Sequence, residues 1–159
     1  MTSTTYTNPI TYTYDTEHSG AHYFFNGKYA NCGEFLESVA KAHRGLDYTV
    51  NPTTSFDKGS DIESEKASVK SGGASLACLY GDTKEEIIKE FFERVASEKF
   101  IYITMVEDNI TEYEMNKTEF KKFLYEFGTL AKESGKKDLQ KVRIRKTSTK
   151  MIKWFEERT

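Results

Sequence analysis

Cysteine and proline are scarce in this chain of 159 residues, which contains two of each. Cys32 and Cys78 lie far apart in the sequence and match no metal-ligand spacing, so they predict neither a disulfide scaffold nor a zinc site. No apolar run approaches the roughly 20 residues that a membrane-spanning helix needs, and the first residues lack the basic and apolar segments of a signal peptide. We therefore expect a soluble, cytoplasmic protein with no membrane partner.

An excess of charge of one sign is also lacking, because the formal net charge is −2. The charge is nevertheless uneven: residues 135–159 hold nine Lys and Arg against three Asp and Glu, a local net charge of +6. Hydrophobic residues make up 37% of the chain and aromatic residues 14%, which is enough for a core in one domain. We expect residues 1–20, with their alternating Thr and Tyr, to be a flexible or edge segment, and residues 21–159 to form a single domain.

Helices and strands alternate along the predicted domain. Apolar residues at spacings of three and four predict helices over residues 31–43, 83–98, 118–134 and 147–158. Strand patterns cover residues 46–51, a hairpin at 59–71, an extended run at 74–80, and residues 100–106, 110–115 and 139–146. This order predicts an α/β (α+β) fold with a central mixed β-sheet flanked by helices.

The hairpin at residues 59–71 carries the chemistry that the sequence suggests. Side chains alternate along a strand, so Ser68 and Lys70 share one face, and Asp61 on the first arm can face the same side as Lys70. A carboxylate and an ammonium inside a small sheet are costly to desolvate, a cost usually tolerated where a metal or a reacting anion uses them. An ordinary cross-strand ion pair at the surface is the alternative interpretation.

Two sequence blocks in this hairpin carry a family resemblance. Gly59-Ser60-Asp61-Ile62, followed after a short turn by Ser68-Val69-Lys70, resembles the core of the PD-(D/E)xK nucleases, the restriction-endonuclease-like superfamily, in its Ser-x-Lys variant. The predicted order of helix, three strands, helix and strand over residues 30–106 is similar to that family's core. The resemblance implies a restriction-endonuclease-like core and a Mg²⁺-dependent DNA endonuclease in which Mn²⁺ can substitute. A restriction, resolvase or repair role stays open.

The resemblance also implies a role for each residue of the motif. Asp61 would anchor the metal together with the backbone carbonyl of Val69, and Lys70 would lie beside the attacking water or the scissile phosphate. Ser68 stands where the family carries a second acidic residue, and it could hydrogen-bond a metal-bound water. The missing carboxylate would come first from Glu37 on the preceding helix. Glu34, Glu63 and Glu65 are the alternatives.

Basic residues near the C-terminus suggest where DNA would bind. Lys141, Arg143 and Arg145 share one face of the predicted strand 139–146, and Lys146 follows them; phosphate contacts from such residues would supply salt-dependent affinity. A solvated charged face is the alternative interpretation. The expected partner is double-stranded DNA, and cutting both strands would require a homodimer. Two other functions stay open: a catalytically inactive nuclease-like fold that binds DNA or protein, and an α/β interaction protein with no nucleic-acid role.

Overall fold

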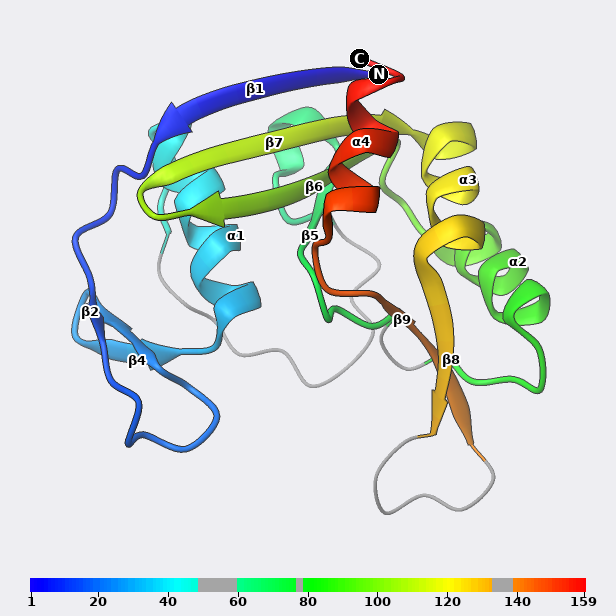
Figure 1. Cartoon of the computed structure of the whole chain (residues 1–159), viewed down its shortest axis with the longest axis horizontal. Coiled ribbons are helices and arrows are strands. Elements are labelled where there is room, and N and C mark those ends of the chain that lie inside the picture. The colour runs from blue at the N-terminus through cyan, green and yellow to red at the C-terminus, as the bar shows by residue number, and fades with distance from the viewer. Residues whose placement is uncertain (49–59, 77–78, 133–138) are drawn as a thin grey trace.

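A mixed four-stranded sheet forms the centre of the molecule (Figure 1). The computed structural model describes residues 1–48, 60–76, 79–132 and 139–159. The strands follow the order β1 (Thr2–Thr7), β7 (Asn109–Asn116), β6 (Lys99–Val106) and β5 (Ala67–Lys70) across the sheet. β5 and β6 are parallel, and the other two pairs are antiparallel. The mixed sheet predicted from the sequence is therefore confirmed.

The two faces of the sheet pack against different helices. Ile101 and Ile103 of β6 point toward α1 (Cys32–His43), where they join one buried cluster. Phe100 and Tyr102 point the other way and join a second buried cluster with the remaining helices, α2 (Lys84–Arg94), α3 (Lys117–Phe127) and α4 (Thr149–Glu156). Burial on both faces explains why residues 100–104 are almost continuously apolar, whereas Val106 at the end of β6 is 69% exposed.

The helix starts are fixed by polar caps that the sequence shows plainly. Asn31 accepts the backbone N–H of Glu34 at 2.8 Å, and Thr83 accepts that of Glu86 at 3.2 Å, as their sequence positions predict. The third helix was predicted to begin at Thr118, but its cap is Asn116, which forms a reciprocal capping box with Glu119. Ser148 caps α4.

The third predicted helix is too long. It ends at Phe127, and the chain continues as β8 (Gly128–Lys132), which pairs antiparallel with β9 (Gln140–Ile144). A Cβ on Gly128 would lie 2.5 Å from the carbonyl oxygen of Leu124, so a residue with a side chain does not fit at this exit. Leu130, expected inward on the helix, is 38% exposed on β8.

Two other segments differ from expectation. Residues 46–48 form no strand, and residues 49–51 of the predicted strand lie outside the described residues. A small sheet of β2 (Thr13–Tyr14), β3 (Tyr23–Phe25) and β4 (Lys28–Ala30) was not predicted. Asn26 and Gly27 link β3 and β4 with positive φ angles, the Asn-Gly hairpin signal that the sequence does contain. In the described part of the chain, none of the helices is both long and apolar enough to cross a membrane.

Candidate functional site at the free edge of β5

The predicted hairpin closes around one pair of residues. Ile62 and Ala67 exchange backbone hydrogen bonds of 3.0 and 3.1 Å, and the short 3₁₀ helix η1 (Glu63–Glu65) makes the turn between them. The first arm is a bend with this single bridge instead of a full strand, and Gly59 lies outside the described residues. The turn therefore brings residue 61 back alongside β5.

Asp61 is held directly by the backbone of β5. Its Oδ2 atom accepts the N–H of Val69 at 2.7 Å. The N–H and C=O of one strand residue point to the same side, so the Val69 carbonyl also points to this edge of β5, away from β6. The Val69 side chain is buried in the cluster beneath α1. One carboxylate and one backbone carbonyl thus share the free edge of the sheet.

Glu37 on α1 meets the charges of the hairpin. Its side chain is 33% exposed, and its Oε1 lies 3.1 Å from the ammonium of Lys41 one turn later. Burial raises the pKa of Glu37 above its usual range, and the negative charge of Asp61 raises it further; the ammonium groups of Lys41 and Lys70 act in the opposite direction. The structure therefore brings Glu37, Asp61 and Lys70 within electrostatic reach of one another.

Ser68 has a structural partner. Its hydroxyl lies 2.6 Å from that of Ser97, which is in turn 2.8 Å from the hydroxyl of Ser60. Ser68 is buried, so this serine cluster ties both arms of the hairpin to the loop that precedes β6. The cluster was not predicted, because a single serine in a loop gives no sequence signal.

The alternative carboxylates are in other surroundings. Glu65 contacts Arg44 at 2.5 Å and Lys99 at 3.3 Å. Although its partial burial acts to raise the pKa of Glu65, hydrogen bonds and charges from these two cations lower it overall. Glu63 is exposed, and Glu34 lies in the first turn of α1, where its N–H binds the Asn31 cap.

The basic strand packs against the segment that follows Lys70. Gly73 donates its N–H to the carbonyl of Ile144 at 2.9 Å, so this segment lies alongside β9. A Cβ on Gly72 would lie 2.9 Å from the backbone nitrogen of Thr147 and 3.0 Å from the Cα of Lys146. The backbone of Lys146 thus packs closely against Gly72, which is two residues after Lys70 in the sequence.

The predicted alternation along the basic strand is confirmed. Val142 and Ile144 are fully buried, whereas Arg143 and Arg145 are exposed. Lys146 is exposed as well, and Lys141 is half-buried.

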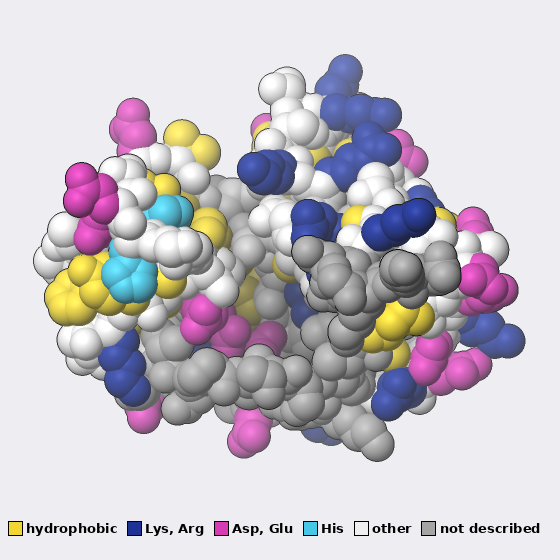
Figure 2. Space-filling view, turned by 90° about the horizontal axis from the view of Figure 1, so that it is seen from below, with side chains coloured by type: hydrophobic (Ala, Val, Ile, Leu, Met, Phe, Trp, Pro, Cys, Tyr) yellow, Lys and Arg dark blue, Asp and Glu magenta, His cyan; other side chains and the backbone are white. Residues whose placement is uncertain are grey.

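Figure 2 shows one face of the molecule, with its side chains coloured by type. The surface is hollowed near its middle, and acidic side chains lie in the hollow. Lys and Arg side chains gather on one side of it, over the part of the chain around β9 and α4. Hydrophobic and histidine side chains gather on the opposite side, over β2–β4. Acidic side chains can bind a cation, and the neighbouring Lys and Arg side chains can bind phosphates. This arrangement suits a phosphate-containing ligand that binds together with a cation.

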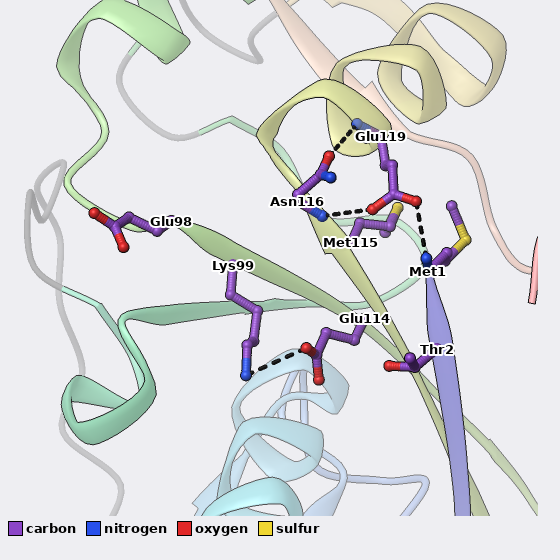
Figure 3. Close-up of a pocket in the computed structure, with 8 residues that line it drawn as sticks. All are labelled: Met1, Thr2, Glu98, Lys99, Glu114, Met115, Asn116 and Glu119. Carbon is purple, nitrogen blue, oxygen red and sulfur yellow. Dashed lines mark hydrogen bonds and ion pairs between the residues drawn. The ribbon is translucent and has the colours of Figure 1, made fainter.

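A separate pocket lies at the other end of β5 and β6. It has a volume of about 180 Å³ and is lined by the start of β1, the end of β7 and the first turn of α3 (Figure 3). In it, Glu119 binds the amino group of Met1 at 3.0 Å, and Lys99 binds Glu114 at 3.3 Å. Four of its charged groups form these two pairs, and Glu98 pairs with Lys66 outside the pocket. Asp61, Lys70 and Glu37 are not part of its lining.

No match to the chain was found among protein-family models, curated proteins or solved structures. Within the described residues, no group of three or more His, Cys, Asp and Glu side chains is placed to hold a metal ion. Asp61 and the Val69 carbonyl lie at the same edge of β5, and the charge of Asp61 acts on the nearby carboxylate of Glu37. Hard oxygen donors of this kind fit Mg²⁺, which typically takes one or two carboxylates and completes its shell with waters and phosphate oxygens.

Proposed function

We propose that the protein is a Mg²⁺-dependent DNA endonuclease with a restriction-endonuclease-like core. The observation that carries this proposal is that Asp61, held at the edge of β5 by the Val69 N–H, and Lys70 both act electrostatically on Glu37 of α1. The connection after the hairpin supports it, because β5, α2 and β6 follow in order and the two strands are parallel. The family resemblance implies helix, three strands, helix and strand, whereas the described residues give α1, the bridged bend at Ile62, β5, α2 and β6.

The residues at this edge can divide the work of phosphodiester hydrolysis. Asp61, Glu37 and the Val69 carbonyl would hold the ion, and Mn²⁺ would substitute. When bound, Mg²⁺ supplies a more acidic water and neutralises charge on the phosphate. The Lys70 ammonium can orient the scissile phosphate as a point charge or exchange a proton with the attacking water. Arg143, Arg145 and Lys146 would contact neighbouring phosphates of the duplex.

Asp61→Asn is the sharpest test of the proposal. The amide keeps an oxygen that can accept the Val69 N–H, so the fold should survive, but the charge that holds a cation is lost. Wild-type protein should nick or cut supercoiled plasmid with Mg²⁺ or Mn²⁺, and Asp61→Asn and Lys70→Ala should each lower the rate at least about 10²-fold. Asp82→Asn, an exposed carboxylate before α2, is the control and should cut normally. Cutting that persists in both site variants would remove the proposal.

The placement of Ser68 favours one other candidate, a nuclease-like fold that binds DNA without cutting it. Ser68 stands where the family carries an acid, and here it serves a hydrogen-bonded serine cluster. Salt-dependent DNA binding with no metal uptake by calorimetry and no cleavage of any DNA would select this candidate over the nuclease.

A further inference from the structure

The small sheet β2–β4 carries aromatic side chains that the core does not use. Tyr23 and Phe25 point inward and pack against Phe35 of α1, with ring centroids 4.4 and 5.3 Å away. Phe24 and Tyr29 belong to the opposite face and are paired in register across β3 and β4. They are 37% and 40% exposed, although a sheet this small could carry polar residues there at no cost.

These outward rings are already arranged as a stack. The ring of His18 lies parallel to that of Tyr29, with centroids 3.8 Å apart and planes 20° apart. Phe24 packs against Tyr29 in a tilted arrangement, with centroids 4.8 Å apart and planes 51° apart. The Tyr29 hydroxyl also reaches the carboxylate of Asp15 at 3.4 Å, which helps to fix the ring. Rings held in place lose little freedom when a flat ligand stacks on them.

We propose that His18, Phe24 and Tyr29 form a base-stacking surface, and that the DNA substrate has unpaired bases beside the cleavage position. This inference rests on the proposed nuclease function and specifies its substrate. Nucleobases stack on aromatic side chains only where they are not paired inside a duplex, and such stacking is a main source of affinity for single strands. A blunt duplex has no free base faces along its length to offer these rings.

The charges on the same face fit this occupant. Hydrophobic and histidine side chains over β2–β4, with some Asp and Glu side chains among them, lie on one side of the hollow, and Lys and Arg side chains gather on the other (Figure 2). Lys28 of β4 is exposed, but it is paired with Phe25 and belongs to the opposite face of the small sheet from Tyr29. A strand that leaves a duplex could place its bases on β2–β4 while the duplex phosphates meet Arg143 and Arg145. Three partly exposed rings offer much less area than the roughly 800 Å² per partner of a stable dimer interface.

Binding measurements without divalent metal test this inference apart from catalysis. Fluorescence anisotropy with EDTA present would compare a labelled 20-nucleotide single strand, a blunt duplex and a fork with two unpaired arms. The wild type should bind the fork and the single strand. The double variant Phe24→Ala, Tyr29→Ala should lose about 10-fold or more in affinity for both, with duplex binding changed less than about twofold.

Two further variants keep the test sharp. Phe24→Leu with Tyr29→Leu removes the rings but retains apolar side chains, so it should lose affinity for the single strand. This variant keeps the test valid if the alanine variant unfolds. Tyr125→Ala removes a ring of equal exposure, 40%, from α3 and should change nothing. Equal binding of the single strand by the wild type and the leucine variant would overturn the inference. The inference would also be overturned if the wild type were a dimer and the leucine variant a monomer with unchanged affinity for the single strand. The rings would then bind a second copy of the chain and not DNA.

The two proposals fail in different ways. If no DNA is cut in an Asp61-dependent manner but the leucine variant still loses single-strand affinity, the nuclease proposal fails and the stacking surface stands. If Asp61-dependent cutting occurs and is equally fast on blunt and forked DNA in both the wild type and the leucine variant, the stacking inference fails alone.

Discussion

Glu37 has an environment that is unfavourable for its charge. It is partly buried and lies close to the carboxylate of Asp61, and both effects raise its pKa. A carboxyl group whose pKa is raised on folding costs stability when ionised, and the cost disappears as the pH falls through the raised value. A protein bears such a cost where a cation or a proton transfer uses the charge.

We predict that Glu37→Gln stabilises the metal-free protein at neutral pH by roughly 0.5–1 kcal/mol, the scale of other charge-optimising substitutions. The gain should be present well above the raised pKa of Glu37 and should shrink as the pH is lowered through it, because the wild-type carboxyl then takes up a proton. Thermal unfolding between pH 4 and pH 8 with EDTA measures this difference. A variant that is less stable at every pH would show that the charge of Glu37 supports the fold.

Glu112 is the opposite case, a buried carboxylate with all its partners present. It is 5% exposed, accepts two hydrogen bonds from the guanidinium of Arg44, at 2.9 and 2.5 Å, and accepts another from the hydroxyl of Tyr6. These contacts join β1, β7 and the end of α1. We assign this group to stability and not to chemistry.

Removing Arg44 should therefore leave an uncompensated buried charge. We predict that Arg44→Ala lowers the free energy of unfolding by about 3–5 kcal/mol, measured by urea denaturation. Arg94→Ala is the matched control, because Arg94 pairs with Glu90 at 3.0 Å where both side chains are 43% exposed; it should cost less than about 1 kcal/mol. Equal losses in the two variants would contradict this assignment.

At the scale of elements, Gly72 links the hairpin to the basic strand. A methyl group at this position would meet the backbone of residues 146–147 and the hydroxyl of Tyr102, all within 3.0 Å. Backbone atoms cannot move aside as a flexible side chain does. The residues just after β9, Arg145 and Lys146, would have to shift away from the segment that follows Lys70.

We predict that Gly72→Ala costs about 1–3 kcal/mol of stability, typical of overpacking, and weakens DNA binding as the basic segment is displaced. Gly33→Ala is the matched control: it lies inside α1, and its added Cβ would meet nothing closer than 3.5 Å. Urea denaturation and anisotropy on the same preparations measure both effects. Wild-type stability and binding in Gly72→Ala would show that the contact does not hold the segment in place.

The elements that the sequence predicted well are those with a strong local signal. The first helix was predicted over residues 31–43 from its apolar stripe and its Asn31 cap, and the structure gives Cys32–His43. The third helix was predicted too long because Leu130 continues the apolar spacing past Gly128. What ends that helix is the pairing of β8 with β9, a contact between distant residues that no local pattern shows.

At the scale of the whole molecule, the excess of positive charge lies in the C-terminal part of the chain, where residues 135–159 have a local net charge of +6. We predict that replacing Arg143, Arg145 and Lys146 with Gln lowers the slope of log K against log salt for duplex binding by about 0.9 for each phosphate that the variant no longer neutralises. Replacing Lys89, Lys121 and Lys122 with Gln removes the same charge from exposed positions on α2 and α3 and is the control. Anisotropy between 50 and 300 mM salt measures the slopes, and equal slopes in both triple variants would contradict a directed DNA-binding face.

The whole site was only partly accessible from sequence. The pairing of Asp61 with the strand of Lys70 followed from a short turn between two strand-like arms, and the choice of Glu37 came from the family resemblance. The contact between Gly72 and Lys146 joins residues 74 positions apart along the chain and depends on the complete fold. The aromatic stack on β2–β4 was missed because the Asn26-Gly27 hairpin that creates it was not recognised.

The proposed nuclease requires Glu37, Asp61 and the Val69 carbonyl to coordinate a divalent cation beside Lys70. Anomalous diffraction from crystals soaked in Mn²⁺ tests it most directly. We expect one manganese peak at the edge of β5. Oxygen atoms of Asp61, Glu37 and Val69 should lie about 2.1–2.3 Å from the manganese ion, close to the metal–oxygen distances of small hard cations. A well-ordered crystal with no manganese at that edge, or with manganese bound only elsewhere, would contradict it.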